Sequence, residues 1–262
     1  MLLHFYKFQA NGNDFVIIDG HENTFPVDEK IIARLCHRQF GIGADGLMIM
    51  QFSEKYDFVM QYFNSDGKPA EMCGNGGRCI AAFAYLRNVA GKFMTFEAPD
   101  GVHEARIENE KTSPRLFDVS LKMQDVSVFR ELTDGWFLNT GVPHFVCFVE
   151  DVETMDVKEQ GKMLRYDKRF MPDGTNVNFV TLQKNELFVR TYERGVENET
   201  LSCGTGVTAS ALATFLKTRQ KITTVRTRGG NFKVDFKPET NQFKAVWLRG
   251  PAEKVFEGTI LL

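Results

Sequence analysis

Apolar residues in the first half of the chain recur in short runs that have the length of β-strands. These runs are rich in branched and aromatic side chains and are bounded by Asn, Asp and Gly residues that favour turns. They predict strands over 2–9, 15–19, 47–52 and 57–63, with shorter strands between 93 and 122. A sheet is therefore expected in this half.

Two other segments of the same half carry apolar residues at helical spacing. The first, over 28–39, begins at Asp28, a favourable N-cap, and is expected to stop at Gly41. The second begins at Cys73 with a glycine-rich turn and runs to about Asn88. Strands and helices are therefore mixed along this half.

The same order of elements returns after Gly135. Strands flank a turn at 141–144, and the later pattern predicts a helix near 154–165, strands over 177–183 and 186–193, and a helix over 204–217. A shift of 203 − 73 = 130 residues superimposes the two halves without a gap. The shift matches Phe15 with Phe145, Val59 with Val189, Tyr62 with Tyr192, Cys73 with Cys203, Gly74 with Gly204, Gly76 with Gly206 and Leu86 with Leu216.

The repeat and the strand pattern together predict the fold class. Residues Phe232 to Phe236 alternate apolar and polar side chains, which is typical of a sheet with one packed and one wet face. We expect an α+β fold of two pseudo-symmetric halves, each a curved, mostly antiparallel sheet wrapped around its cysteine-led helix. The break at Thr112-Ser113-Pro114 is the best internal boundary, which places the halves over 1–114 and 115–249.

Composition and charge narrow the class of protein. The 262 residues are 43% hydrophobic, which is enough for one or two real cores. With 32 Lys and Arg against 34 Asp and Glu, no basic stripe favours nucleic acid. The N-terminus lacks the features of a signal peptide and no apolar run reaches membrane-spanning length, so we expect a cytoplasmic protein. The odd set of five cysteines suits free thiols in a reducing compartment.

Cys73 and Cys203 stand at matching positions, each before a glycine turn that opens a helix. Because a helix N-terminus favours negative charge, we expect each thiol to have a pKa below its ordinary value of about 8.5. If the halves pack about a pseudo-twofold axis, one sulfur can remove a proton from a carbon while the other supplies one to the opposite face. The backbone N–H groups at both helix ends could hold the neighbouring carboxylate; they belong to Gly74, Asn75, Gly204 and Thr205.

The remaining cysteines and a glycine motif are interpreted differently. Cys36, Cys79 and Cys147 lie within apolar helix or strand patterns, so they are expected to be inert core residues. A metal site that joins cysteines to His144 lacks any CxxC or HxxxH spacing. The GxGxxG letters of residues 41–46 follow a helix and precede a strand, which is the reverse of a dinucleotide site.

Several motifs dispersed over the whole chain resemble those of the diaminopimelate epimerase family. They are Gly12-Asn13-Asp14-Phe15, Phe40-Gly41-Ile42-Gly43-Ala44-Asp45-Gly46, Asn64-Ser65-Asp66-Gly67, Cys73-Gly74-Asn75-Gly76, Pro143-His144, Asn176-Val177, Glu193-Arg194-Gly195, Cys203-Gly204-Thr205-Gly206 and Gly250-Pro251-Ala252. The resemblance implies cofactor-independent interconversion of LL- and meso-2,6-diaminoheptanedioate, in lysine and peptidoglycan-precursor synthesis. It also implies a homodimer, and a terminal strand, 250–262, that returns to the first half.

The resemblance further implies roles for individual residues. Cys73 and Cys203 would be the proton donor and acceptor, and the turns at 74–75 and 204–205 would hold the reacting carboxylate. The substrate-anchoring set would be Asn13, Asn64, Asn176, Glu193 and Arg194. In that set, Glu193 can accept an ammonium and Arg194 can clamp a carboxylate, which suits the distal amino-acid group of the substrate.

The chain departs from the family pattern at two positions. Val142 stands where many members carry Asn, and Gly46 stands where some carry Gln. Each change removes a side-chain hydrogen bond near the expected site. His144 has two interpretations, a polar neighbour of the site or a buried structural histidine.

Three other functions compete with this interpretation. A proline or hydroxyproline racemase uses the same two-cysteine chemistry, but its substrate would leave Glu193 and Arg194 without a distal group to hold. A phenazine-pathway isomerase of similar fold lacks the two cysteines. In a noncatalytic redox module, Cys73 and Cys203 would form a switchable disulfide.

Overall fold

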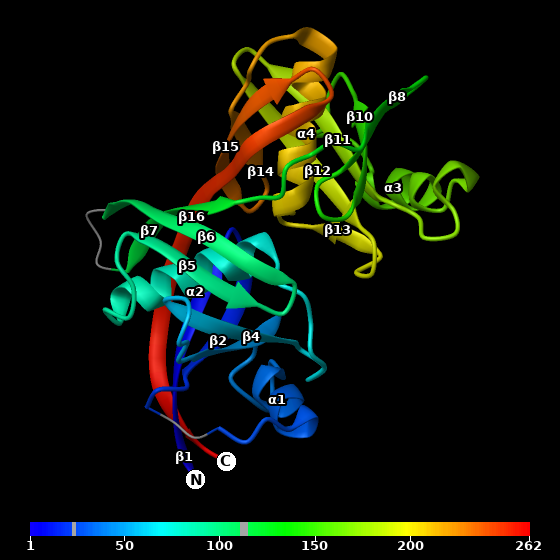
Figure 1. The fold of residues 1–262 in the computed structure, drawn as a ribbon. Coiled ribbons are helices and arrows are strands. Elements are labelled where there is room, and N and C mark those ends of the chain that lie inside the picture. The colour runs from blue at the N-terminus through cyan, green and yellow to red at the C-terminus, as the bar shows by residue number, and fades with distance from the viewer. Residues whose placement is uncertain (23–24, 111–114) are drawn as a thin grey trace. The chain divides into compact units, whose positions relative to one another are not determined.

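The computed structural model describes residues 1–22, 25–110 and 115–262. The chain forms two compact units, one of residues 1–121 and 250–262 and the other of residues 122–249. The expected break at 112–114 lies outside the described residues, and the division falls after Leu121, whereas the sequence placed it after residue 114. The last strand, β16 (Gln242–Leu261), leads from the second unit back into the first (Figure 1).

The first unit has a sheet of seven strands that is completed by the end of β16. The pairings in chain order are antiparallel, parallel, antiparallel, parallel, antiparallel and antiparallel. Residues 250–253 of β16 pair with β7, and residues 253–261 pair with β1. The elements are β1 (Leu2–Ala10), β2 (Asn13–Asp19), α1 (Glu29–Cys36), β3 (Gly46–Gln51), β4 (Phe58–Asn64), α2 (Gly74–Leu86), β5 (Phe93–Ala98), β6 (Gly101–Glu110) and β7 (Leu116–Lys122).

The second unit repeats this frame. From β9 to β16 its pairings follow the same series of antiparallel and parallel partners, which confirms the repeat and the mostly antiparallel sheets. The elements are β8 (Phe129–Leu132), β9 (Gly135–Asn139), β10 (Pro143–Phe148), α3 (Val157–Arg165), the 3-10 helix η1 (Lys168–Phe170), β11 (Asn176–Gln183), β12 (Glu186–Glu193), β13 (Asn198–Thr200), α4 (Gly204–Thr218), β14 (Thr224–Thr227), β15 (Gly230–Glu239) and the first part of β16.

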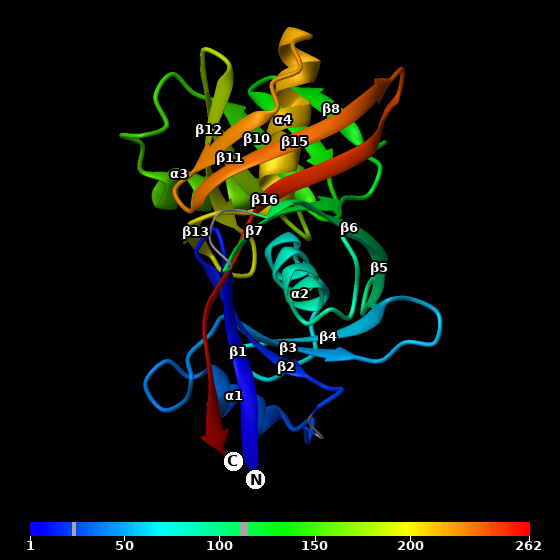
Figure 2. The ribbon, with the colours of Figure 1, turned by 90° about the vertical axis from the view of Figure 1, so that its left-hand side faces the viewer.

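A cysteine-led helix is buried in each unit, as the repeat predicted. Residues 74–84 of α2 are all buried, and the strands of its unit surround it (Figure 2). Residues 206–214 of α4 are buried likewise. Both helices are rich in Gly and Ala, whose small size lets the sheet approach closely. The first turn of each helix is thereby held in place by its sheet.

The outer helices are amphipathic and shorter than expected. Asp28 caps α1 by accepting hydrogen bonds from the N–H groups of Lys30 and Ile31, as predicted. The helix nevertheless ends at Cys36, before Gly41, because His37 has an extended backbone. In the second unit α3 begins at Val157, three residues later than expected, because Asp156 supplies its N-cap.

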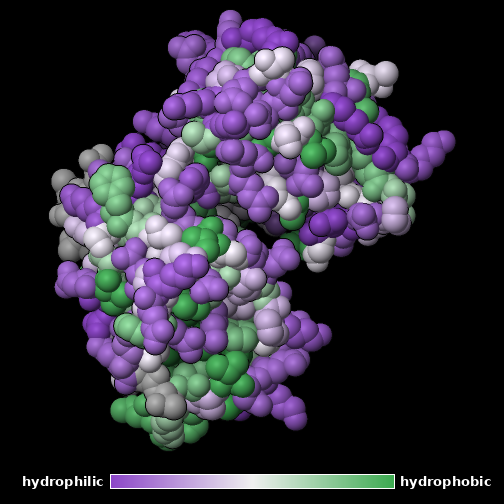
Figure 3. Space-filling model, viewed as in Figure 1, coloured by the Kyte–Doolittle hydropathy of each residue, from purple (hydrophilic) through white to green (hydrophobic). Residues whose placement is uncertain are grey.

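The strand faces are divided as the alternation predicted. Phe232, Val234 and Phe236 of β15 are buried, whereas Lys233 and Asp235 between them are exposed. The face of the molecule in Figure 3 is largely hydrophilic, with hydrophobic residues scattered over both units. Among the described residues, none of the helices combines the length and the apolar character needed to cross a membrane.

Candidate active site

Cys73 is the N-cap residue of α2. Its backbone is extended, and its sulfur accepts a hydrogen bond from the N–H of Gly76 at 3.2 Å. The sulfur also lies 3.9 Å from Oδ1 of Asn13, which projects from the start of β2. The sequence expectation of a cysteine at a helix N-terminus is confirmed here, and Asn13 is brought to it from 60 residues away.

Asn75, in the first turn of α2, is buried and tied to both neighbours. Its Nδ2 donates to Oδ1 of Asn13 at 3.4 Å, and its Oδ1 accepts from Arg78 at 2.8 Å. Arg78 is fully buried and also donates to the carbonyl of Gly74 and to Oδ1 of Asn11. Burial lowers the pKa of Arg78 to about 10. This guanidinium therefore supports the start of the helix from inside the unit.

Gly46 makes room for a tyrosine that the sequence analysis did not single out. A Cβ atom at Gly46 would lie 2.6 Å from Cε2 of Tyr62 and 3.1 Å from the Tyr62 hydroxyl oxygen. Burial raises the pKa of Tyr62, and the charge of Cys73 and hydrogen bonding with it raise that pKa further. The Tyr62 phenol group beside Cys73 thus occupies the space that a side chain at position 46 would need.

Cys203 is the N-cap residue of α4 and is buried. Its sulfur lies 3.4 Å from the hydroxyl oxygen of Thr205. Glu193, at the end of β12, is a hydrogen-bonding partner of Cys203 and also accepts from the hydroxyl of Thr200 at 2.5 Å. Glu193 therefore lies beside the Cys203 thiol, whereas the sequence analysis assigned it to the distal group of the substrate.

The electrostatics of Cys203 correct one expectation. Burial raises its pKa, and the negative charge of Glu193 raises it further. Hydrogen bonds from Thr205 and from the N–H of Gly206 oppose this change only in part. The expectation that the helix N-terminus lowers the pKa was therefore wrong for Cys203, because desolvation outweighs the helix end. Burial likewise raises the pKa of Glu193, against hydrogen bonds with Thr200 and Cys203.

A buried chain of hydrogen bonds fixes the direction of the Thr205 hydroxyl. Nδ2 of Asn178 donates to the carbonyl of Phe145 at 3.3 Å and faces Nδ1 of His144 at 3.0 Å. Because an amide N–H only donates, Nδ1 of His144 must accept and Nε2 must carry the proton. Nε2 therefore donates to Thr205 Oγ1 at 2.9 Å, which leaves the Thr205 hydroxyl hydrogen free to donate to the sulfur of Cys203.

His144 is neutral in this chain. Burial lowers its pKa to about 3, although the hydrogen bond with Asn178 raises it in part. His144 is thus a buried histidine, and it also contacts the hydroxyl of Thr205 in the turn that follows Cys203. Thr140 adds a second contact by donating to the Thr205 carbonyl at 3.0 Å.

The other anchoring candidates lie on strand ends. In the second unit, Asn176 donates to the carbonyl of Pro143 at 3.1 Å and accepts from the backbone N–H of Arg194 at 2.8 Å. The Arg194 side chain is half-buried and donates to the carbonyl of Asp173. In the first unit, Asn64 ends β4 and is exposed, and its backbone closes the turn through Gly67 and Lys68.

The remaining cysteines are packed as expected, with one exception. Cys36 and Cys79 are buried, whereas Cys147 is only half-buried. Burial raises the pKa of all three thiols, that of Cys36 to about 12. Within the part of the chain that the structure describes, no cluster of three or more His, Cys, Asp or Glu residues is arranged to hold a metal ion.

Several residues around the two cysteines escaped the sequence analysis. For Arg78 a signal existed, since it is a lone charge within a helix of small and apolar residues. For Asn178 the signal was its place within a strand of buried residues. Tyr62 stood in the repeat and Asp45 in a family motif, but their contacts near Cys73 and Asn13 gave no signal, because they depend on partners distant in the sequence.

Known proteins of one family match this chain over nearly its whole length. The family model for diaminopimelate epimerase matches residues 5–127 and 136–255. A diaminopimelate epimerase from Flavobacterium psychrophilum is 44% identical over 259 residues, which cover 97% of this chain and 99% of the relative. One from Aquifex aeolicus is 42% identical, with 98% of each chain covered.

Solved structures share the fold at low sequence identity. A PhzF-family phenazine biosynthesis protein from Bacillus anthracis has a TM-score of 0.75 at 15% identity, with all of both chains covered. A probable proline racemase from Agrobacterium radiobacter has a TM-score of 0.70 at 13% identity, covering 99% of this chain and 93% of that one. These two show the fold alone, whereas the full-length matches at about 40% identity show that this chain belongs to the diaminopimelate epimerase family.

Proposed function

We propose that this chain interconverts LL- and meso-2,6-diaminoheptanedioate at the α-carbon, with Cys73 and Cys203 as the two proton carriers and without a cofactor. The observation that carries the proposal is the pair of cysteine N-caps at equivalent positions of the two units. Full-length identity of 44% with a diaminopimelate epimerase supports the substrate. The activity is that of an isomerase.

The chemistry requires the two sulfurs on opposite faces of the α-carbon. One thiolate takes the α-proton and becomes a thiol, and the electron pair of the broken C–H bond remains on the carbon. The other thiol gives its proton to the opposite face and becomes a thiolate. The α-carboxylate shares the negative charge of the intermediate, and the N–H groups of the two helix ends are the donors suited to it: those of Gly74, Asn75, Gly204 and Thr205.

Charged groups in the second unit suit the other substrate groups. Glu193 lies beside Cys203, so its carboxylate is placed to accept an ammonium near the reacting carbon. The half-buried guanidinium of Arg194 suits a carboxylate, and Asn176 holds the Arg194 backbone in position. Asn13 and Asn64 complete the proposed binding set from the first unit.

The test combines a substrate panel with isotope exchange in the reduced protein. We expect incorporation of deuterium from heavy water at the α-carbon of LL-diaminopimelate, with formation of the meso isomer. Cys73→Ala and Cys203→Ala should each lower kcat/KM by about 10²-fold or more, because each removes a positioned acid or base. Cys147→Ala is the matched control, since that half-buried thiol lies outside the proposed site.

The panel also separates the rival functions. Racemisation of L-proline or trans-4-hydroxy-L-proline without turnover of diaminopimelate would replace the proposed substrate. Full turnover by Cys203→Ala would remove the two-base mechanism. Inertness toward the whole panel, with reversible Cys73–Cys203 oxidation, would favour a redox module.

Oligomeric state and location are part of the same proposal. We propose a cytoplasmic homodimer, supported by the family resemblance and by five free cysteines that need a reducing environment. Exposed apolar residues near both chain ends offer a surface for a second copy: Met1, Leu2, Phe256 and Leu261. Sedimentation of the reduced protein reads the oligomeric state directly.

A further inference from the structure

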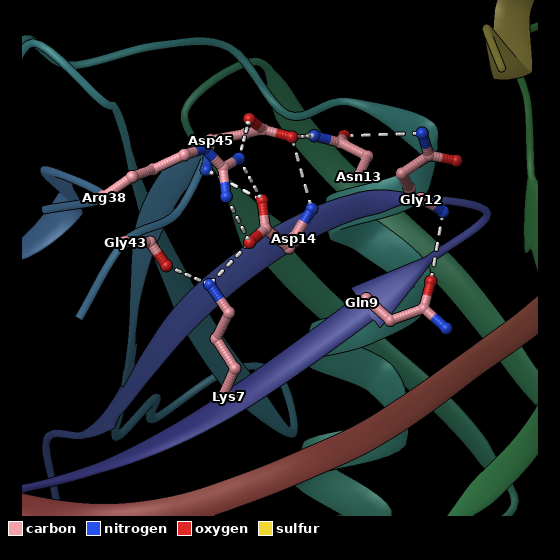
Figure 4. Close-up of polar contacts among 9 residues, drawn as sticks. Lys7, Gln9, Gly12, Asn13, Asp14, Arg38, Gly43 and Asp45 are labelled. Atoms are coloured by element: carbon pink, nitrogen blue, oxygen red, sulfur yellow. Dashed lines mark hydrogen bonds and ion pairs between the residues drawn. The ribbon is translucent and has the colours of Figure 1, made fainter. Parts of the chain in front are cut away.

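A cluster of four charged side chains lies next to Asn13 in the first unit (Figure 4). Lys7 from β1 donates to Asp14 of β2 at 2.6 Å and also to the carbonyl of Gly43. Arg38, which follows α1, donates to Asp14 at 2.8 Å and to Asp45 at 2.7 Å. The cluster therefore joins three segments of the chain through two carboxylates and two cations.

Asp14 and Asp45 are also joined by hydrogen bonds from their backbone N–H groups. The N–H of Asp45 donates to the carbonyl of Asp14 at 2.9 Å, and the N–H of Asp14 donates to Oδ2 of Asp45 at 3.3 Å. Burial opposes ionisation of Asp14, but hydrogen bonds from Arg38 and Lys7 lower its pKa to about 2. The Asp45 carboxylate is thus fixed by Arg38 and by the Asp14 backbone, independently of Asn13.

Asp45 decides which way the Asn13 amide points. Its Oδ2 lies 2.7 Å from Nδ2 of Asn13. An ionised carboxylate only accepts hydrogen bonds, so the nitrogen of Asn13 must face Asp45 and the oxygen must face away. Figure 4 shows the Asn13 amide with its nitrogen directed at the Asp45 carboxylate.

A second constraint from α2 requires the same orientation. Arg78 is a donor only, so Oδ1 of Asn75 must face it, at 2.8 Å. Nδ2 of Asn75 then points to Oδ1 of Asn13 at 3.4 Å, where only an acceptor is satisfied. The contacts of Asn13 with Asp45 and with Asn75 therefore favour the same amide orientation. In this orientation Oδ1 of Asn13 faces the sulfur of Cys73 at 3.9 Å.

We propose that Asp45 is a positioning residue for Cys73, which locks the Asn13 amide so that a carbonyl oxygen accepts the S–H of the thiol. The lock supplies Cys73 with a fixed acceptor and withholds an N–H donor that would stabilise the thiolate. It determines how readily Cys73 gives up its proton and in which direction the S–H points. This inference rests on the proposed role of Cys73 as a proton carrier.

The test is alkylation of the free enzyme by iodoacetamide, with Cys73 and Cys203 quantified separately by peptide mass spectrometry. In Asp45→Asn the new amide can donate to Asn13 at the position of the 2.7 Å contact. Asn13 can then turn its oxygen to residue 45 and its NH₂ toward Cys73, where it stabilises the thiolate, at the loss of the longer 3.4 Å contact with Asn75. We expect Cys73 alkylation near pH 7.5 to rise about tenfold, since a hydrogen bond to a charged group is worth that factor or more. Cys203 alkylation should stay at the wild-type rate, and diaminopimelate turnover should fall.

Two further variants make the result specific. Asp45→Glu keeps an acceptor-only charge and should restore Cys73 alkylation toward wild type. Glu22→Gln removes a different exposed ion pair of the same unit, with Arg87, and should change neither thiol. Equal acceleration at Cys73 and Cys203 in Asp45→Asn, or no change at either, would overturn the proposal.

A measurement on the wild-type protein covers the case in which Asp45→Asn does not fold. Neutron diffraction would show the two amide deuterons of Asn13 on the side of Asp45, and deuterons on the side of Cys73 would overturn the proposal. Neither the alkylation rates nor the amide orientation depends on turnover. Failure of the wild type to epimerise diaminopimelate would therefore count against the function and leave the positioning result standing.

Discussion

At the scale of single residues, each cysteine faces a polar side chain whose orientation is fixed by hydrogen bonds to other residues. Cys73 faces the carbonyl oxygen of Asn13, and Cys203 faces the hydroxyl of Thr205. The first direction depends on the charge of Asp45, and the second on a chain that starts at a backbone carbonyl. The two thiols therefore occupy different environments within a repeated frame, which suits one acid and one base.

His144 provides a prediction at this scale. Its folded pKa of about 3 lies below the unfolded value near 6.5, so the unfolded state binds more protons between those values. Stability should therefore be retained above about pH 6.5 and lost as the pH falls toward 3, by at most about 1.4 kcal/mol per pH unit from this residue. His144→Gln, whose amide can donate to Thr205 and accept from Asn178, should show a flatter loss. Urea unfolding from pH 7 to 4 measures the free energy of unfolding of the wild type and of His144→Gln. Parallel pH curves for the two proteins would contradict the low pKa of His144. Nitrogen NMR should show the ring proton on Nε2.

At the scale of elements, the repeat preserves backbone pairings and changes what the central helix packs against. Gly76 of α2 and Gly206 of α4 are matched by the shift of 130 residues. A Cβ atom at Gly76 would make ordinary contacts, 3.4 Å from the sulfur of Cys73 and 3.5 Å from that of Met48. A Cβ atom at Gly206 would lie 2.2 Å from Oδ1 of Asn178. The second helix thus needs its glycine, and the first tolerates a side chain.

The matched pair Gly76→Ala and Gly206→Ala tests this difference. Gly76→Ala should be neutral or raise the free energy of unfolding by about 0.5–1 kcal/mol, because alanine favours a helix interior. Gly206→Ala should lower it by about 1–3 kcal/mol through overpacking, and should disturb the hydrogen bond of Asn178 to His144. Urea denaturation of the two variants gives the comparison. Similar losses in both would show that the packing difference has no energetic consequence.

At the scale of the whole molecule, the chain is two similar units joined twice, after Leu121 and again within β16. The second joint returns residues 250–262 to the first unit, where Pro251 accepts from Arg78 and the last strand pairs with β1. Catalysis as proposed needs each unit to contribute one thiol. Under that proposal, either unit by itself would lack one of the two proton carriers.

Oxidation tests whether the sulfurs of Cys73 and Cys203 can come close enough to form a disulfide. If Cys73 and Cys203 reach one α-carbon from opposite sides, a mild oxidant should inactivate the enzyme by linking them, and a dithiol should restore activity. Bound diaminopimelate should slow the loss by occupying the space between the sulfurs. Tryptic mapping of the oxidised protein identifies the bond, and pairs that involve Cys36, Cys79 or Cys147 in its place would contradict the facing arrangement.

The sequence by itself determined the frame of this protein. Strand and helix periods, the Asp28 cap, the repeat of 130 residues and the cysteine-led helices all depend on neighbours within a few positions or on direct comparison of the halves, so they are legible in the chain. The motifs shared with diaminopimelate epimerase likewise indicated the family that the comparisons then showed.

Only the tertiary structure decided the chemistry around each sulfur. The expected low pKa failed at Cys203 because burial depth and the approach of Glu193 follow from packing. Asp45 reaches Asn13 across 32 residues, and Tyr62 fills the space left by Gly46, so neither contact is visible in local sequence. The physical reason is that desolvation and donor direction depend on what surrounds an atom in space, whereas secondary structure depends largely on what surrounds a residue in the chain.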